Sequence, residues 1–131
     1  MQDFAERYTA AWCSQDPARV AEFFSANGSL RVNDGAPAVG RSAIAAVAQG
    51  FMTDFPDLQV ILDGIEMQGD RTIYRWTLTG TKNGLRVRIS GFEEWRIGGD
   101  GLIAESLGHF DSDDYARQLT PPAPCGQTGP P

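Results

Sequence analysis

The second half of the chain is a run of strand-like segments joined by tight turns, and this run limits the possible folds more than any other feature. The segments are rich in β-branched and aromatic residues and alternate apolar with polar positions, which is typical of strands. The turns between them contain Gly-Asp, Asn-Gly and Gly-Gly pairs, which favour antiparallel hairpins. The predicted strands span residues 58–67, 71–81, 85–97 and 102–110.

The first half of the chain is helical in pattern, because its apolar residues recur at helical spacing. Asp16 followed by Pro17 is a typical helix start, and Pro56 prevents a helix from continuing past it. The expected elements of this half are helices over 2–13, 16–27 and 41–55 and a short strand over 29–32, and a last short helix is expected over 113–119.

Helices followed by hairpin-linked strands are typical of the α+β class. With 131 residues, the chain is long enough for one domain with a buried core. We expect this domain to cover residues 1–120. Residues 121–131 are rich in proline and glycine, and we expect them to form a flexible tail.

Composition argues against several kinds of function. The formal net charge of −6 disfavours nucleic acid as a partner. No apolar run approaches the ~20 residues of a membrane span, and the N-terminus lacks signal-peptide features, so we expect a cytoplasmic protein. One histidine and two distant cysteines do not make a zinc site of usual spacing, and no phosphate-binding glycine motif is present. We therefore expect neither a metal nor a cofactor.

Three stretches resemble a known family. They read FMTDFPDLQV at the end of the long predicted helix, YRWTLTGTKNG in a predicted hairpin, and DGLIAESLGHFDSDDYARQL over the last strand and helix. Together with the order of elements, they resemble the SnoaL-like polyketide cyclase branch of the nuclear transport factor two superfamily, which is related to the ketosteroid isomerases. The resemblance covers about residues 3–120.

This resemblance implies a cone-shaped barrel, in which a strongly curved, mostly antiparallel sheet wraps around the long helix with the two N-terminal helices beside it. It also implies an enclosed pocket for a small hydrophobic ligand or substrate, and a homodimer formed through the outer face of the sheet. The cyclase branch carries a general acid/base aspartate at the end of its last strand, and Asp111 matches that position.

The ketosteroid isomerases point to further residues. The segment ERYTAAW resembles the one that carries their oxyanion-hole tyrosine, and this resemblance implies that role for Tyr8. The segment RVNDG resembles the one that carries their catalytic base, and this resemblance implies that role for Asp34. Their second oxyanion-hole acid, an aspartate, falls near Glu93. A purely structural role is the alternative for two of these residues. Tyr8 belongs to an apolar helix stripe, and Asp34 belongs to a turn.

Strand parity gives an independent argument for Glu93. Within residues 85–97, Glu93 shares a face with the apolar residues, whereas Glu94 lies on the polar face. A carboxyl group directed into an apolar cavity is desolvated, so its pKa should rise, which suits a general acid or a neutral hydrogen-bond donor. The alternatives are a buried carboxyl with satisfied hydrogen bonds, or a β-bulge that reverses the parity.

His109 and Asp111 share one face of the last strand, about 7 Å apart. This spacing allows both to line one pocket, with Asp111 as the acid/base and the histidine as its assistant. The alternative is that the polar residues from Asp111 onward cap the last helix.

These arguments favour a cofactor-free isomerase or cyclase that moves a proton next to the carbonyl group of a small hydrophobic substrate. The alternative is a non-catalytic domain that binds a small molecule or mediates dimerisation. Epoxide hydrolysis would need two carboxylates flanking an arginine in the pocket. The alternation of side chains along the strands places the arginines mostly outside the pocket. The candidate catalytic residues are Asp111, His109, Tyr8, Glu93 and Asp34. The residues expected to line the pocket are Trp12, Phe51, Phe55, Tyr74, Trp76, Trp95 and Leu107.

Overall fold

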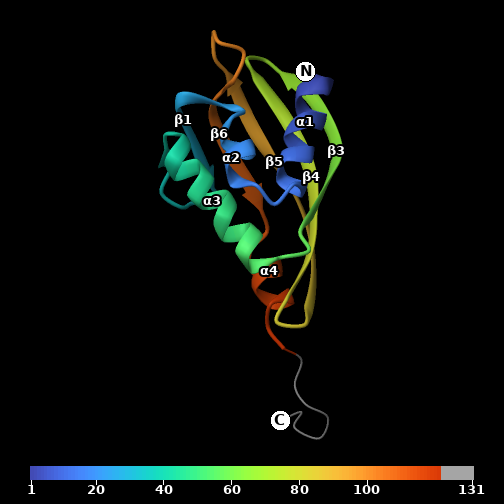
Figure 1. Ribbon diagram of the computed structural model, residues 1–131. Helices are drawn as coiled ribbons and strands as arrows, with labels where there is room; N and C mark the ends of the chain where they lie inside the picture. Colours follow the sequence, from blue (N-terminus) through green and yellow to red (C-terminus); the bar gives the residue numbers. More distant parts are fainter. Residues whose placement is uncertain (122–131) are drawn as a thin grey trace, which may run out of the picture.

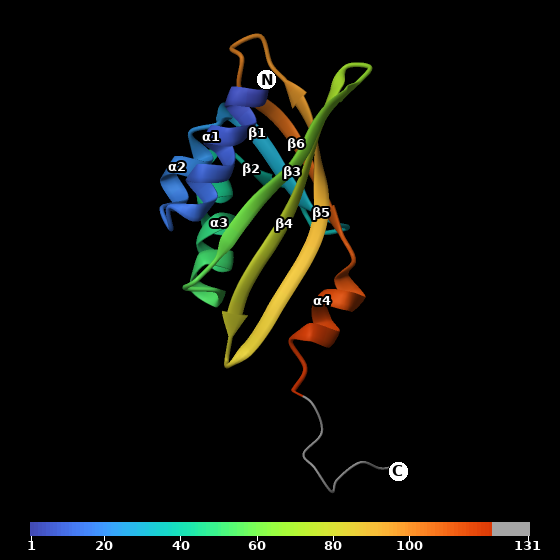
Figure 2. The same ribbon diagram turned by 90° about the vertical axis from the view of Figure 1, so that its right-hand side faces the viewer.

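Six strands form one curled sheet, and three helices lie against its concave face (Figures 1 and 2). This computed structural model describes residues 1–121. A fourth, short helix lies at the end of the molecule that also holds the turn between the fourth and fifth strands. In chain order the elements are α1 (Gln2–Cys13), α2 (Pro17–Ala21), β1 (Phe24–Val32), β2 (Ala38–Val39), α3 (Arg41–Asp54), β3 (Gln59–Gln68), β4 (Arg71–Lys82), β5 (Leu85–Ile97), β6 (Ile103–Phe110) and α4 (Ser112–Gln118).

Helix boundaries follow from local chemistry. The Asp16 side chain caps α2 by accepting a hydrogen bond from the backbone N–H of Ala18. Gly40 precedes α3 with a φ of 90°, a backbone conformation that glycine adopts readily. Helix α3 ends two residues before Pro56, which cannot continue it.

The strand order is β2-β1-β6-β5-β4-β3, so the sheet curls without closing into a barrel. Strands β3 to β6 pair as successive antiparallel hairpins, as their turn sequences predict. Asn83 and Gly84 between β4 and β5 have φ values of 53° and 79°, the positive values that a two-residue hairpin turn requires. The one parallel pairing in the described sheet joins β1 to β6. The predicted α+β class with a strongly curved sheet is confirmed.

The sequence predictions differ from the structure mainly between α2 and α3. Helix α2 ends at Ala21 and does not reach residue 27, because Phe24 already pairs with Ile103 of β6. The sequence does not predict β2, since a strand of two residues carries no periodic signal. Residues 122–131, which make up most of the predicted tail, lie outside the described part of the chain.

A bulge between β5 and β6 determines which side chains of β6 point inward. The register shifts between Arg96 and Ile97, which leaves Ala104 as an extra residue on β6. After the bulge, the even-numbered residues from 106 to 110 face the helices and the odd-numbered ones face outward.

Two clusters of buried apolar side chains join the helices to the sheet. One gathers around α1 and includes Tyr8, Phe24 and Trp95. The other includes Phe55 and Leu58 and lies nearer to α4. None of the helices in residues 1–121 has the length and apolar character that a membrane crossing requires.

Candidate functional site

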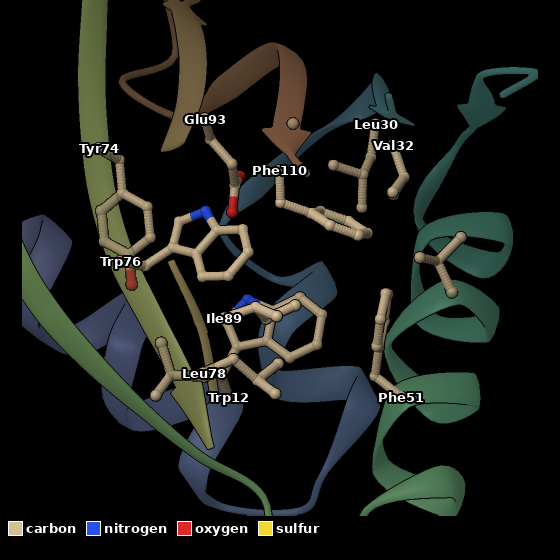
Figure 3. Close-up of a pocket in the computed structure, with 13 residues that line it drawn as sticks. Trp12, Leu30, Val32, Phe51, Tyr74, Trp76, Leu78, Ile89, Glu93 and Phe110 are labelled. Carbon is tan, nitrogen blue, oxygen red and sulfur yellow. The ribbon is translucent and has the colours of Figure 1, made fainter. Parts of the chain in front are cut away.

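A cavity of about 60 Å³ lies where the two clusters meet, between the concave face of the sheet and helices α1 and α3 (Figure 3). Its walls are almost entirely apolar or aromatic. Among the described residues that line it, only Glu93 carries a formal charge. The lining residues are Trp12, Leu30, Val32, Val47, Phe51, Val60, Tyr74, Trp76, Leu78, Ile89, Glu93, Gly108 and Phe110.

Glu93 places a carboxyl group in this wall, and neighbouring side chains donate hydrogen bonds to it. Its Oε1 accepts from Ser106 Oγ at 2.7 Å, from Trp95 Nε1 at 2.9 Å and from Tyr8 Oη at 3.1 Å. Its Oε2 receives only the second, 3.3 Å contact of the Tyr8 hydroxyl. Since donors already surround Oε1, a proton held by Glu93 belongs on Oε2. The carboxyl group projects toward the space between the rings of Trp76 and Phe110 (Figure 3).

Burial and hydrogen bonding have opposite effects on the Glu93 carboxyl. Desolvation raises its pKa above the ordinary value, while the hydrogen bonds from Trp95, Ser106 and Tyr8 lower it, and burial is the larger effect. Burial, followed by the nearby Glu93 charge, also raises the pKa of Tyr8 well above its usual range. Glu93 therefore retains its proton to higher pH than an exposed glutamate, and Tyr8 acts as a hydrogen-bond donor.

Aromatic packing holds this group of polar side chains in position. Tyr74 stacks on Trp95 with ring centroids 4.8 Å apart, and Tyr8 meets Trp95 edge to face at 5.2 Å. Thr9 Oγ1 bonds the Ala5 carbonyl oxygen and lies 2.6 Å from the Tyr74 hydroxyl. Both tyrosine rings are thus anchored at two points, which limits the movement of the donors around Glu93.

Several of the residues predicted from the sequence do meet at this cavity. Trp12, Phe51 and Trp76 line it together with Tyr74 and Glu93. Tyr8 is completely buried and reaches the site through its hydrogen bond to Glu93.

The other residues expected to line the pocket lie elsewhere. Phe55 packs in the cluster near α4, and Trp95 is buried behind Glu93. Leu107 lies on the outward-facing side of β6, because the bulge at Ala104 reverses the parity that the sequence suggests.

His109 and Asp111 do not face the cavity. The His109 ring lies on the outer face of the sheet, where it stacks on Phe92 and Nε2 lies 2.7 Å from Glu94 Oε2. Asp111 is exposed and caps α4 by accepting hydrogen bonds from the backbone N–H groups of Asp113 and Asp114.

Asp34 is also exposed, in the turn after β1, and it lines an open hollow together with His109 and Asp111. The structure therefore brings three predicted acid/base residues together on the outer face, away from Glu93 and Tyr8. Of the two interpretations of Asp111 given above, the structure shows the helix cap, and His109 and Asp111 do not line the inner cavity.

Ser106 is a polar site residue that the sequence reasoning did not identify. It lies in β6, fully buried, and makes the shortest hydrogen bond to Glu93. Strict alternation of side chains along β6 places Ser106 on the face opposite His109, and the structure has Ser106 on that face. Only the bulge reveals that this face is the inner one.

No group of three or more His, Cys, Asp or Glu side chains that could hold a metal ion occurs among residues 1–121. The inner site thus offers one carboxyl group in an apolar cavity, supported by a tyrosine, a serine and a tryptophan. This arrangement can accept or donate a hydrogen bond or a proton at one point of a small apolar molecule.

Solved structures with the same architecture define the class of fold. A hypothetical protein with a ketosteroid isomerase-like fold from Catenulispora acidiphila, in complex with trimethylamine, superposes with a TM-score of 0.79 at 18% identity, covering 88% of this chain and 91% of that one. A putative SnoaL-like polyketide cyclase from Jannaschia sp. superposes with a TM-score of 0.75 at 16% sequence identity. The alignment covers 93% of this chain and 94% of that one. AclR, a putative hydroxylase from Streptomyces galilaeus, superposes with a TM-score of 0.73 at 24% sequence identity. The alignment covers 92% of this chain and 96% of that one. The fold is that of the nuclear transport factor two-like α+β cones.

The sequence assigns the chain to one family within this class of fold. The SnoaL-like domain family matches residues 5–106, and the chain belongs to this family. No curated protein matches the sequence.

Proposed function

We propose that the inner cavity binds a small, largely apolar molecule with a carbonyl group, and that Glu93 exchanges a proton with the carbon next to that carbonyl. The reaction would be of the isomerase or cyclase type and would need no cofactor. Tyr8 and Ser106 would keep the carboxyl group in position and adjust its proton affinity.

One observation carries this proposal: a buried carboxyl group with hydrogen-bond donors on one oxygen stands in the wall of an otherwise apolar cavity. Such a carboxyl has a raised pKa and holds or releases its proton nearer to neutral pH than usual, which is what a general acid or base requires. The Catenulispora protein of the same fold is in complex with a small molecule, trimethylamine, which supports small-molecule binding as a use of this fold.

A non-catalytic binding domain is the second candidate. The observation that favours it is that Asp111 caps α4, so that among the described residues Glu93 is the only carboxyl group in the cavity lining. Epoxide hydrolysis has less support, because no arginine lines the cavity among the described residues.

Deuterium exchange separates the two candidates without knowledge of the natural substrate. Small ketones are first screened for binding by thermal shift. Each ketone that binds is then incubated with the protein in D₂O, and the loss of its α-proton signals is followed by NMR. We expect the protein to accelerate this exchange, because proton removal next to a carbonyl is the proposed step.

Glu93→Gln is the decisive variant, and Glu94→Gln is its matched control on the next residue of β5, facing the opposite way. We expect Glu93→Gln to bind the ketone and lose the accelerated exchange, typically by a factor of about 10²–10⁴, while Glu94→Gln keeps it. Binding without accelerated exchange in the natural chain would support the binding domain instead. Equal loss in both variants would contradict the role given to Glu93.

A further inference from the structure

The indole N–H of Trp76 is a buried hydrogen-bond donor without a partner among residues 1–121. Trp76 lies on β4, and its ring forms part of the cavity wall. A buried donor with no acceptor loses the free energy of its hydration and gains nothing in return, so folded proteins leave few of them. The packing of the protein by itself does not explain this donor.

Packing holds the indole ring in place. Gly91 lies opposite Trp76 in the β4–β5 pairing, and a methyl group added at Gly91 would come within 2.7 Å of Trp76 Cζ2. The Phe110 ring packs edge-on against Trp76, with centroids 6.1 Å apart. Because both neighbours touch the ring, the N–H cannot turn to another acceptor without disturbing the sheet.

The N–H also lies at the polar end of the cavity. The Trp76 ring edge that rests on Gly91 is the edge that carries the nitrogen, since Cζ2 and Nε1 are bonded to the same ring carbon. Glu93 follows Gly91 on the same face of β5, and Figure 3 shows the Trp76 nitrogen on the side of the ring toward the Glu93 carboxyl. The described hydrogen bonds of that carboxyl come from other residues, so it does not satisfy the indole.

We propose that the Trp76 N–H donates a hydrogen bond to an uncharged oxygen of the ligand, a carbonyl oxygen in particular, and thereby selects the ligands that the cavity accepts. A ligand that is anionic before any proton transfer, such as a carboxylate, is disfavoured, because no Lys, Arg or His among the described residues lines the cavity to balance its charge. Trp76 would be a specificity-determining residue. This inference rests on the proposed ligand-binding function and adds the residue that sets the class of ligand.

A pair of probes with the same shape tests the proposal. Cyclohexanone carries a carbonyl oxygen, and methylenecyclohexane replaces that oxygen with a CH₂ group. The chain has three tryptophans, so a ¹⁵N-labelled sample should give three indole N–H signals, and Trp76→Phe identifies one of them by its loss. We expect cyclohexanone to move the Trp76 proton signal downfield and methylenecyclohexane to leave it nearly in place. The Trp95 signal is an internal control, because its N–H already bonds Glu93.

Affinities give a second readout. Trp76→Phe should weaken cyclohexanone binding about three- to tenfold relative to methylenecyclohexane, which is the range of one net hydrogen bond. Tyr115→Phe, which alters an aromatic side chain outside the cavity lining, should leave the ratio of the two affinities unchanged. Equal movement of the Trp76 signal by both probes, or an unchanged affinity ratio in Trp76→Phe, would overturn the inference and leave the proposed binding function intact. Failure of both probes to bind the natural chain would contradict the proposed function and the inference together.

Discussion

Two adjacent glutamates show how much the environment of a single residue decides. Glu93 points inward, where Tyr8 and Ser106 donate hydrogen bonds to its carboxyl group among buried, largely apolar side chains. Glu94 points outward and pairs with His109, with about a third of each side chain exposed. The same chemical group is therefore a candidate acid/base at one position and a hydrogen-bond partner of a histidine at the next.

Glu93→Gln should change how stability varies with pH. Burial raises the pKa of Glu93 above its ordinary value of 4.5, so the folded state keeps a proton that the unfolded chain has already released. The stability contributed by this proton is fully present below the unfolded pKa and is lost as pH rises through the folded pKa. Relative to Glu93→Gln, the natural chain should lose about 1.4 kcal/mol per pH unit in that window.

Urea denaturation of both chains over a pH series measures this difference, and Glu94→Gln again serves as the control. A stability difference between the natural chain and Glu93→Gln that stays constant from about pH 4 to pH 8 would contradict a raised pKa for Glu93.

The sequence identifies some site residues and misses others for physical reasons. Tyr8 and Glu93 are recognisable because each is a polar side chain at an apolar position of a regular element. Ser106 is not, because a serine in a strand is unremarkable until its position relative to the bulge is known. The lack of a partner for the Trp76 N–H among residues 1–121 is a property of packing, and no local pattern predicts it.

At the scale of elements, Asp111 connects the last strand to α4. A pair of substitutions at this residue separates its role as a helix cap from the predicted role as an acid/base. Asp111→Ala removes the cap of α4 and should lower the free energy of unfolding by about 1 kcal/mol. Asp111→Asn keeps a capping oxygen and should cost only a few tenths of a kcal/mol. We expect Asp111→Asn to retain the accelerated deuterium exchange, since the side chain does not face the cavity. Loss of exchange in a stable Asp111→Asn protein would restore Asp111 as the acid/base.

Gly91 controls the approach of neighbouring elements at the centre of the sheet. A Cβ atom at this position would collide with the His109 carbonyl oxygen of β6 and with the Trp76 ring of β4. Gly91→Ala should therefore destabilise the protein by about 1–3 kcal/mol through overpacking. Gly99→Ala is the control, because nothing lies within 4 Å of its added methyl group. Chemical denaturation of both variants measures the difference, and equal stabilities would show that the sheet adjusts without cost.

For the whole molecule, we propose that two copies pair through the outer face of the sheet. Phe92 projects from this face, stacked on His109, with the Arg75 guanidinium 5.8 Å from its ring. The same face carries both positive and negative side chains, including Arg75 and Glu94, so two copies related by a twofold axis can place unlike charges opposite each other.

Light scattering tests this pairing. We expect a mass of about twice the 14.2 kDa of one chain, and a monomer for Phe92→Glu, because the new charge would be buried in the contact. Val39→Glu introduces the same charge at an exposed position on β2, where Val39 is 63% exposed, and should leave the mass unchanged. A natural chain that is already monomeric at micromolar concentration would refute the proposal.

The sequence by itself determined the α+β class, the hairpin order of the last four strands and the inward direction of Glu93. These follow from local periodicity and turn chemistry, which act over a few neighbouring residues. The tertiary structure alone decided which face of β6 is the inner one, and with it the separation of His109 and Asp111 from Glu93 and Tyr8. One extra residue in a strand reverses every side chain beyond it, and whether a bulge forms depends on pairing with a distant strand.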